Sequence, residues 1–248
     1  MFDDLKGKAV VVTGGVTGIG GAAALGFAKA GARVLSQYLG GGPELKTIEE
    51  AGIKTIRLDL TEKTSPQSLI DEAIKAFGRI DVIVNNAGSL VARKPLTEID
   101  DTFFDSVLDI NVRQLVHCCR LAADQMVKQK SGNIINVTSI AARQGSSPGG
   151  SIYAGAKGFV SSFTKSLAKE LVGHGIRVNC VSPGTIHTAF HDRFSDAEKR
   201  AATAKTIPMQ RLGLADDCTG AFLYLASDEA SRYVTGQMLE VNGGQLMP

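Results

Sequence analysis

Tyr153 and Lys157 are four residues apart, a spacing that places both side chains on one face of a helix, one turn apart. A phenol ordinarily titrates near pH ~10 and is a poor acid at neutral pH. A neighbouring ammonium favours the phenolate and lowers the phenol pKa towards the range where proton transfer is efficient. The same pair is also typical of an ordinary helix surface, so its surroundings must decide between the two interpretations.

Ser139 lies just beyond an apolar, β-branched run over residues 133–138, which predicts a buried strand. A loop rich in Gly, Pro and Ser follows at residues 145–150 and allows the chain to turn back. We therefore predict that Ser139 and Tyr153 face one substrate oxygen, with Lys157 beside them.

A second constellation lies near the N-terminus, where Gly14, Gly18 and Gly20 separate an apolar run at 8–13 from an Ala-rich segment that extends to Ala30. A glycine turn between a strand and a helix lets the backbone approach a pyrophosphate and points helix N–H groups at it. The strand before the turn and the helix after it are the context that this motif requires.

The composition excludes several classes of function. The 248 residues are 44% hydrophobic and 21% charged, with a net charge of +2 and no dense block of Lys or Arg, so nucleic acid is not an expected partner. The four cysteines show no zinc-ligand spacing and are expected to be reduced, buried thiols. No apolar run approaches membrane-spanning length and no apolar leader is present, so we expect a cytoplasmic protein that does not bind membranes.

Strands and helices are predicted to alternate along the chain, and the strands are apolar throughout rather than alternating. This pattern is typical of an α/β fold with a doubly wound parallel sheet and helices on both faces. With no linker or repeat, residues 1–248 are predicted to form a single domain, in which 182–207, after a strand's carboxyl end, form a lid over the substrate. The predicted strands are 8–13, 33–38, 53–58, 81–85, 133–138, 175–181 and 237–242, and the predicted helices are 44–51, 65–77, 100–128 and one from Tyr153 to 172.

Taken together, these motifs resemble the short-chain dehydrogenase/reductase family over the whole chain. The matching residues, in the family's order and spacing, are Thr13-Gly14…Gly18-Ile19-Gly20, Asn85-Asn86-Ala87-Gly88, Asn111, Ser139, Tyr153…Lys157 and Pro183-Gly184…Thr188. Ala156 stands where the family often has Ser, and the interval from Ser139 to Tyr153 is one residue longer than usual, which leaves the placement of Ser139 to be tested.

The resemblance implies a Rossmann-type sheet and NAD(P)-linked interconversion of alcohols and carbonyls. It implies that Tyr153 is the general acid/base, that Ser139 hydrogen-bonds the substrate oxygen, and that Lys157 holds the nicotinamide ribose and lowers the Tyr153 pKa. Asn111 would interrupt its helix to hold a water of the proton relay. The cofactor-binding positions that follow are Gly14, Thr17, Gly18, Ile19, Gly20, Tyr38, Asp59, Leu60, Asn86, Ala87, Gly88, Tyr153, Lys157, Pro183, Gly184, Ile186 and Thr188.

The choice of cofactor depends on the corner after the second predicted strand, where an acidic residue favours NAD and a basic one favours NADP. Tyr38 and Leu39 occupy this corner, and Thr17 is not basic either. Because no carboxylate repels a phosphate, and because the backbone of 40–42 can offer N–H groups, the sequence favours NADP(H), with NAD(H) as the alternative.

Two substrate classes remain open: a small polar keto sugar or uronate, and a 3-oxoacyl group carried on acyl carrier protein. The segments 1–8, 89–101 and 183–191 look like those of bacterial reductases of the alginate-derived 4-deoxy-hexoseulose uronate, which favours the first class. Arg143, Gln144 and His187 are the candidates for the substrate's polar groups, against an alternative of ordinary solvated surface, whereas Arg93 and Lys94 are expected farther out. His187 and His191 lack a third ligand, so no metal is predicted.

A different class of function also fits the fold, namely a regulator that binds NAD(P) without doing chemistry. The complete set of Asn111, Ser139, Tyr153 and Lys157 favours an enzyme, because a sensor needs no proton donor. The family further implies a homotetramer, with the apolar pairs at 103–104 and 107–108 at a helix interface.

Overall fold

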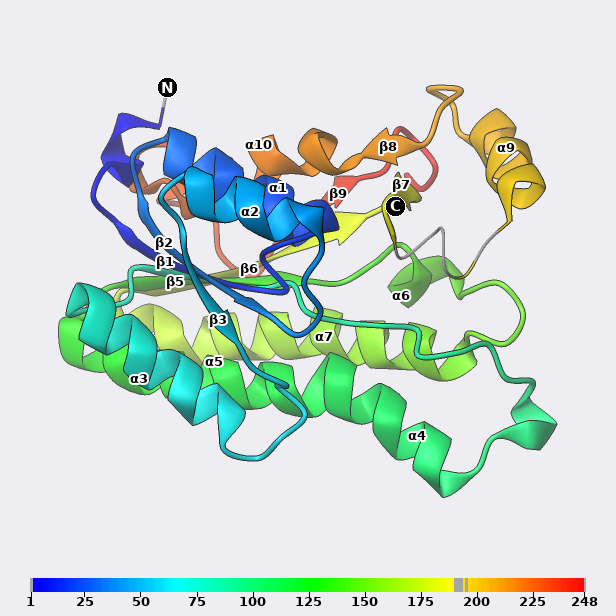
Figure 1. Ribbon diagram of the computed structural model, residues 1–248, viewed down its shortest axis with the longest axis horizontal. Helices are drawn as coiled ribbons and strands as arrows, with labels where there is room; N and C mark the ends of the chain where they lie inside the picture. The colour runs from blue at the N-terminus through cyan, green and yellow to red at the C-terminus, as the bar shows by residue number, and fades with distance from the viewer. Residues whose placement is uncertain (1, 190–193, 195, 248) are drawn as a thin grey trace.

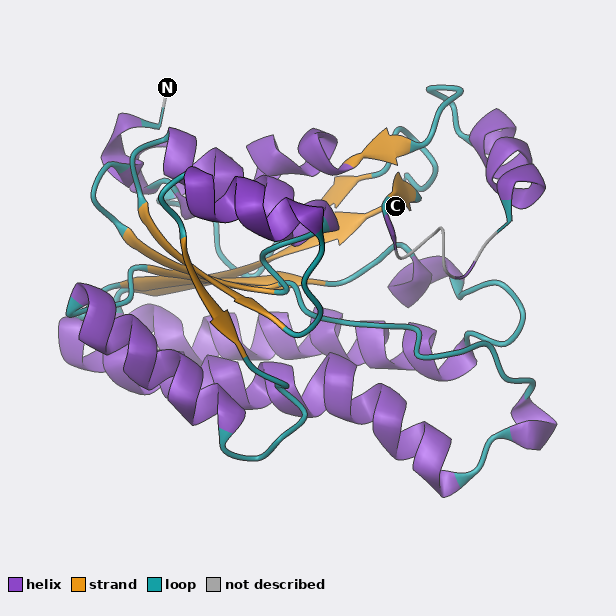
Figure 2. Cartoon of the chain, in the orientation of Figure 1, coloured by secondary structure: helices purple, strands orange, loops and turns teal. Residues whose placement is uncertain are grey.

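The computed structural model describes residues 2–189, 194 and 196–247. Its centre is a seven-stranded parallel sheet in the order β3-β2-β1-β4-β5-β6-β9 (Figures 1 and 2). The strands are β1 (Ala9–Thr13), β2 (Arg33–Tyr38), β3 (Lys54–Arg57), β4 (Val82–Asn85), β5 (Gly132–Val137), β6 (Ile176–Pro183) and β9 (Met238–Val241). A separate parallel pair joins β7 (Ile186–His187) to β8 (Gly213–Leu214).

Helices cover both faces of this sheet, as the sequence predicts. In Figure 1, α1, α2 and α10 lie on one face and α3, α4, α5 and α7 on the other. The helices are α1 (Gly18–Lys29), α2 (Pro43–Glu50), α3 (Ser65–Phe77), α4 (Asp101–Leu108), α5 (Gln114–Gln129), α6 (Ala141–Gln144), α7 (Ser151–Leu171), α9 (Ala197–Thr206), α10 (Thr219–Ala226) and α11 (Asp228–Ser231). The predicted doubly wound Rossmann-type sheet is therefore confirmed.

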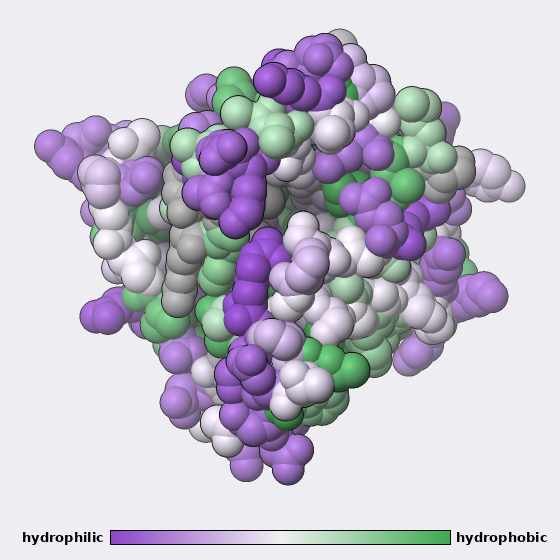
Figure 3. Space-filling model, turned by 90° about the vertical axis from the view of Figure 1, so that its right-hand side faces the viewer, coloured by the Kyte–Doolittle hydropathy of each residue, from purple (hydrophilic) through white to green (hydrophobic). Residues whose placement is uncertain are grey.

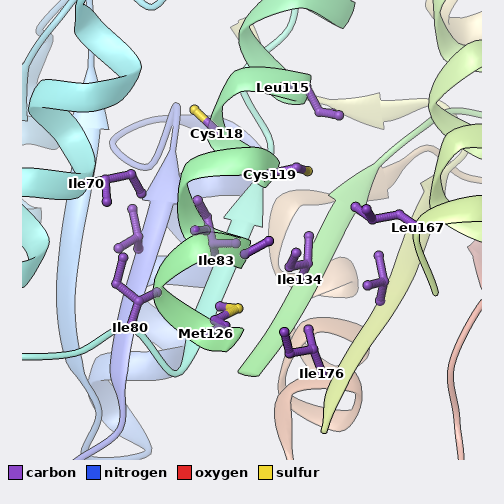
Figure 4. Close-up of a cluster of buried hydrophobic side chains, with 14 of the residues drawn as sticks. Ile70, Ile80, Ile83, Leu115, Cys118, Cys119, Met126, Ile134, Leu167 and Ile176 are labelled. Atoms are coloured by element: carbon purple, nitrogen blue, oxygen red, sulfur yellow. The ribbon is translucent and has the colours of Figure 1, made fainter. Parts of the chain in front are cut away.

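The strands are apolar throughout because each one serves two cores. Val10 and Val12 face the cluster under α1, α2 and α10, whereas Val11 faces the cluster under α3, α5 and α7. The second cluster also contains Cys118 and Cys119, both on α5 (Figure 4). All four cysteines are unpaired and buried, in agreement with the sequence prediction.

Local sequence sets where several helices begin and end. Asp100 caps α4 by accepting a hydrogen bond from the Phe103 backbone N–H at 2.7 Å. Gly78 ends α3 in the left-handed conformation, with a φ of 76°, which a residue without a Cβ adopts at little cost.

The predicted helix over 100–128 is interrupted in the middle. Asp109–Arg113 forms a π-helical turn between α4 and α5, and Asn111 lies within it. This confirms the interruption that the family resemblance implies, although amphipathic periodicity alone predicts one continuous helix. Such turns widen the helix locally and are frequent at functional sites.

Candidate active site

A cavity of about 720 Å³ opens at the carboxyl ends of the strands, where the topology leaves a crevice. β1 lies between β2 and β4, so the chain crosses to opposite sides of β1, and ligands of open α/β sheets bind at such a switch point. Figure 3 looks onto the side of the molecule that lies at the right in Figure 1, where hydrophilic and hydrophobic residues surround a recess.

The glycine turn after β1 forms one wall of the cavity. Gly14 and Gly18 have φ values of 59° and 54°, and the Gly14 N–H donates to Gln37 Oε1 at 2.9 Å. Asn86 Nδ2 donates to the carbonyl oxygens of Thr13 and Gly14, at 3.1 Å each, and so joins this turn to the end of β4. The two loops that flank the switch point are therefore held as one unit.

The family motif implies that Gly20 contacts the cofactor, but the structure gives this residue a different role. It does not line the cavity, and a Cβ placed on it would lie 2.1 Å from the Gly14 carbonyl oxygen. Its missing side chain lets α1 pack against the turn, so it shapes the site without reaching a ligand.

The residues at this end of the cavity fit a dinucleotide. α1 begins after Thr17 without a side-chain cap, so the unpaired N–H groups at its start are available to a pyrophosphate. A Cβ on Gly18 would lie 3.2 Å from Thr188 Cγ2, so a larger residue would narrow the cavity there. The predicted cofactor residues that line the cavity are Gly14, Thr17, Gly18, Ile19, Asp59, Leu60, Asn86, Ala87, Gly88, Tyr153, Lys157, Pro183, Gly184, Ile186 and Thr188.

Tyr38 is not among the residues that line the cavity, contrary to the sequence prediction. Its ring packs against the core cluster beneath α1 and α2, while its neighbours Gln37 and Leu39 line the cavity instead. Successive side chains of a strand point to opposite faces, so Gln37 turns towards the crevice and also donates to the Leu58 carbonyl at 2.6 Å. That alternation is a signal by which the sequence could have identified Gln37.

Asn111 is fully buried and its side chain is occupied by the backbone around it. Its Nδ2 donates to the Ser89 carbonyl at 2.7 Å and to the Val107 carbonyl at 2.9 Å, and its Oδ1 accepts from the Ser89 N–H at 3.2 Å. Asn111 does not line the cavity. These bonds fix the segment after β4 against the π-helical turn.

Ser139 and Tyr153 are hydrogen-bonded to each other through their side chains and both line the cavity, as the sequence predicts. Ser139 Oγ also accepts from the Ala141 N–H at 3.1 Å, which fixes its orientation at the start of α6. Burial raises the pKa of Tyr153 to about 12, and the hydrogen bond with Ser139 acts in the opposite direction. The phenol is therefore protonated at neutral pH and has a hydrogen to give.

Lys157 lies one turn along α7 with its amine 5.7 Å from the Tyr153 ring centre. The side chain is only 4% exposed, and its Nζ donates to the Val137 carbonyl at 2.9 Å. Burial lowers the pKa of Lys157 to about 8. Burial thus shifts the Tyr153 pKa upwards in this structure, and the lowering of this pKa by Lys157 stays a prediction.

The substrate end of the cavity differs from the prediction in two of its three residues. Gln144 lines the cavity, but Arg143 pairs with Glu240, with Nε and Oε1 3.1 Å apart, and neither Arg143 nor His187 is part of the lining. His191 lies outside the described residues. The lining instead includes Arg93, which the sequence places too far out. The other residues at this end are Ser89, Leu90, Ile140, Ala141, Gly145, Ser146, Ser147, Ala189, Thr203, Thr206 and Gln245.

Two further findings concern the described part of the chain. Among residues 2–189, 194 and 196–247 there is no group of three or more His, Cys, Asp or Glu side chains placed to hold a metal ion. In the same residues, no helix combines the length and apolar character needed to cross a bilayer.

Known proteins resemble this chain along its full length. A family model described as enoyl-(acyl carrier protein) reductase matches residues 14–245. The 3β-hydroxysteroid dehydrogenase 1 of Eggerthella lenta is 39% identical over 259 residues, covering 100% of this chain and 97% of the relative. The 3-oxoacyl-[acyl-carrier-protein] reductase FabG of Thermotoga maritima is 34% identical over 245 residues, covering 97% and 98%.

Among solved structures, NADH-dependent reductase A1-R′, described as responsible for alginate metabolism, matches with a TM-score of 0.89 at 34% identity over 99% of this chain and 100% of that one. A second structure of A1-R′ is complexed with NAD and matches with a TM-score of 0.88 at 34% identity over 100% of both chains. These matches support a nicotinamide cofactor and oxidoreductase chemistry. The chain belongs to the short-chain dehydrogenase/reductase family and is an NAD(P)-dependent oxidoreductase.

Proposed function

We propose that the protein reduces the ketone of a small polar keto sugar or uronate to an alcohol. The observation that supports this most directly is the cavity lining, which contains several polar side chains besides the Ser139–Tyr153 pair. Those side chains are Gln144, Ser146, Ser147, Thr203, Thr206 and Gln245. They can exchange hydrogen bonds with the hydroxyl groups of a sugar, whereas an acyl chain would leave them without partners.

In this proposal Ser139 and Tyr153 hold the carbonyl oxygen of the substrate between their hydroxyl groups. A reduced nicotinamide bound in this cavity would supply a hydride, that is one proton and two electrons, for the carbonyl carbon. Negative charge then develops on the oxygen, where both hydroxyl groups stabilise it, and Tyr153 gives its proton to form the alcohol. The tyrosinate regains a proton from solvent before the next turnover.

Lys157 would assist this step by position and by charge. Its ammonium is anchored to the Val137 carbonyl and faces the Tyr153 ring, so it stabilises the tyrosinate that proton transfer leaves behind. The same amine lies on the cavity wall where the nicotinamide ribose is expected to bind.

For the cofactor we propose a preference for NADP(H), with NAD(H) as the alternative. The end of β2 carries Tyr38 and not a carboxylate. The neighbouring strand β3 places a cation beside this end, because Arg57 Nε donates to the Leu39 carbonyl at 3.0 Å. Leu39 lines the cavity, and Arg57 makes no other hydrogen bond or ion pair to the described residues. Its guanidinium therefore lies beside the corner where a 2′-phosphate would be received.

Michaelis constants for NADPH and NADH test this proposal. We expect Arg57→Ala to raise the constant for NADPH and leave that for NADH nearly unchanged, and Lys54→Ala, an exposed cation on the same strand, to change neither. Tyr38→Asp should shift the preference towards NADH. A strong preference of the unmodified enzyme for NADH would overturn the proposal.

The runner-up substrate is the 3-oxoacyl group of an acyl carrier protein, which FabG of Thermotoga maritima carries in its name. That reaction needs a basic docking surface beside the cavity mouth. Lys94 is paired with Asp100 at 2.8 Å and Arg143 with Glu240, so of these neighbouring cations Arg93 alone lacks a carboxylate partner among the described residues, and one cation does not make such a surface. A panel of keto-uronates, neutral keto sugars, a 3-oxoacyl thioester and a 3-oxosteroid, assayed with both cofactors, decides between the classes. Clear preference for the thioester or the steroid would refute the proposed substrate.

Three wider proposals accompany this function. Residues 190–193 and 195 of the predicted lid 182–207 lie outside the described residues, and the described part of the segment is proposed to cover the substrate, which is supported by Thr203 and Thr206 of α9 in the cavity wall. The protein is a cytoplasmic homotetramer, which is supported by the unpaired thiols and by two exposed rings on the outer helices, Phe104 and Phe159. Light scattering should give a mass close to four chains of 26.1 kDa, and a monomer would contradict the assembly.

A further inference from the structure

Arg93 stands out among the residues that line the cavity because of its charge. Apart from Lys157, it is the one cationic side chain among the described residues of the lining, and Asp59 is the one acidic side chain. Lys157 is buried against Val137 at the catalytic centre, and Asp59 accepts from Thr61 at the adenosine end. The substrate end therefore carries a single guanidinium.

The backbone before Arg93 is bent in a way that costs energy. Val91 has a φ of 64°, a left-handed conformation that a β-branched side chain rarely adopts. Its N–H donates to Ser89 Oγ at 3.0 Å, and the Ala92 N–H donates to the Leu90 carbonyl at 2.8 Å. Strained turns of this kind persist where the surrounding structure holds them, and they cluster at ligand sites.

The bend brings Arg93 against the loop that precedes α7. The Lys94 N–H donates to the Gly149 carbonyl at 3.1 Å, and a Cβ on Gly149 would lie 2.9 Å from the Arg93 Cβ. Gly149 has a φ of 80°, so both its conformation and its missing side chain permit the close approach. Arg93 is thus fixed at its base by two segments far apart in the sequence.

The partners of the guanidinium are all neutral. Nε donates to the Phe194 carbonyl at 3.3 Å, and Nη1 donates to the carbonyls of Ser147 at 3.3 Å and Pro148 at 3.1 Å. No carboxylate of the described residues forms an ion pair with Arg93, although Lys94 and Arg143 are each paired with one. Its side chain is exposed at the cavity mouth and keeps an uncompensated positive charge there.

We propose that Arg93 binds the carboxylate of the substrate, which narrows the proposed keto sugars to keto-uronates. The inference rests on the proposed function. It gives Arg93 the contact to a polar group of the substrate that the sequence predicts for Arg143. A carboxylate is a stronger acceptor than a carbonyl and can engage two guanidinium N–H groups side by side, so it would replace the long contacts to the backbone. The bound substrate would also exclude water from the guanidinium, which strengthens the ion pair between Arg93 and the carboxylate.

The test compares one substrate in two charge states. The 4-deoxy-hexoseulose uronate and its methyl ester carry the same carbonyl and hydroxyl groups, but the ester lacks the charge. We expect the unmodified enzyme to favour the free acid in kcat/KM by about tenfold to a hundredfold, the range typical of a charge-assisted hydrogen bond. Most of this ratio should come from KM, and it should fall as salt is added.

Three variants isolate the residue. Arg93→Gln should remove the preference for the acid while leaving the kcat/KM of the ester within about threefold, whereas Arg93→Lys should keep part of the preference because it keeps the charge. Lys94→Gln, which changes the adjacent but paired cation, should leave the ratio unaltered. Calorimetric titration of Tyr153→Phe and Tyr153→Phe/Arg93→Gln with the free acid provides a readout that does not depend on turnover, and the double variant should bind more weakly.

The outcomes separate this inference from the proposed function. If the unmodified enzyme reduces both forms equally, or if Arg93→Gln retains the preference for the acid, the role of Arg93 is overturned while keto-sugar reduction stands. If neither form is reduced and a thioester or steroid is, the proposed function fails and the inference fails with it.

Discussion

Gly88→Ala should damage the active site without disturbing the backbone. The Gly88 backbone lies outside the left-handed region, so alanine fits its conformation. The new Cβ, however, would lie 2.8 Å from Asn111 Oδ1 and 3.1 Å from Lys157 Nζ. Neither group can yield freely, because Asn111 makes three hydrogen bonds to backbone groups and the Lys157 amine is held by Val137.

The size of the loss in stability follows from the hydrogen bond between Lys157 Nζ and the Val137 carbonyl, which the new Cβ would disturb. A hydrogen bond that involves a charged group contributes about 1.5–3 kcal/mol, and Lys157 is buried, so its loss is not made up by water. For a chain of this length, that loss corresponds to a fall in Tm of about 3–12 °C. Displacement of Lys157 should also lower kcat/KM by about tenfold or more, since about 1.4 kcal/mol in the barrier has that effect.

Gly220→Ala is the matched control, because Gly220 lies on α10, on the face of the sheet opposite to α7, and a Cβ there meets no atom within 4 Å. Replacing a helical glycine by alanine should stabilise the protein by about 0.5–1 kcal/mol and leave turnover unchanged. Thermal denaturation and steady-state kinetics of both variants provide the measurements. If Gly88→Ala matches the unmodified protein in Tm and in kcat/KM, the contact between the Gly88 position and Lys157 does not hold the site together.

The remaining predictions concern the proton donor and the pH dependence of stability. Tyr153→Phe should abolish turnover at neutral pH while cofactor binding, followed by fluorescence titration, stays nearly intact; a folded variant with more than a few per cent of the activity would remove Tyr153 as the donor. Lys157→Ala should weaken both cofactor binding and turnover, and tight binding in this variant would contradict its placement at the ribose. Burial raises the pKa of Cys118, Cys180 and Cys218 to about 12 from an ordinary 9.0, so the folded state keeps protons that the unfolded state loses, and stability should fall as pH rises above about 9. Lys157, whose pKa is lowered from 10.5 to about 8, acts in the opposite sense between those values, but one amine is outweighed by three thiols. Urea denaturation at pH 8, 9 and 10.5 measures the balance, and stability that rises throughout would show that the thiols are not buried as described.

The sequence by itself predicted what depends on local pattern. Continuous apolar runs identified strands buried on both faces, and the glycines at 14 and 18 identified the turn that the crevice requires. The spacing of Tyr153 and Lys157 placed them on one helical face, and the strand that ends before Ser139 brought that residue to the same edge of the sheet. These inferences succeed because helix and strand periods fix directions over a few residues.

Tertiary structure decided everything that depends on which distant segments meet. Arg143 follows Ser139 closely in sequence, yet Glu240 on β9 draws it away from the cavity. Arg93 enters the lining only because a strained turn at Val91 and a glycine at 149 let two remote loops touch. Burial likewise raises the pKa of Tyr153, and this could not be predicted from sequence, because desolvation depends on every element packed around the phenol and no local spacing records it.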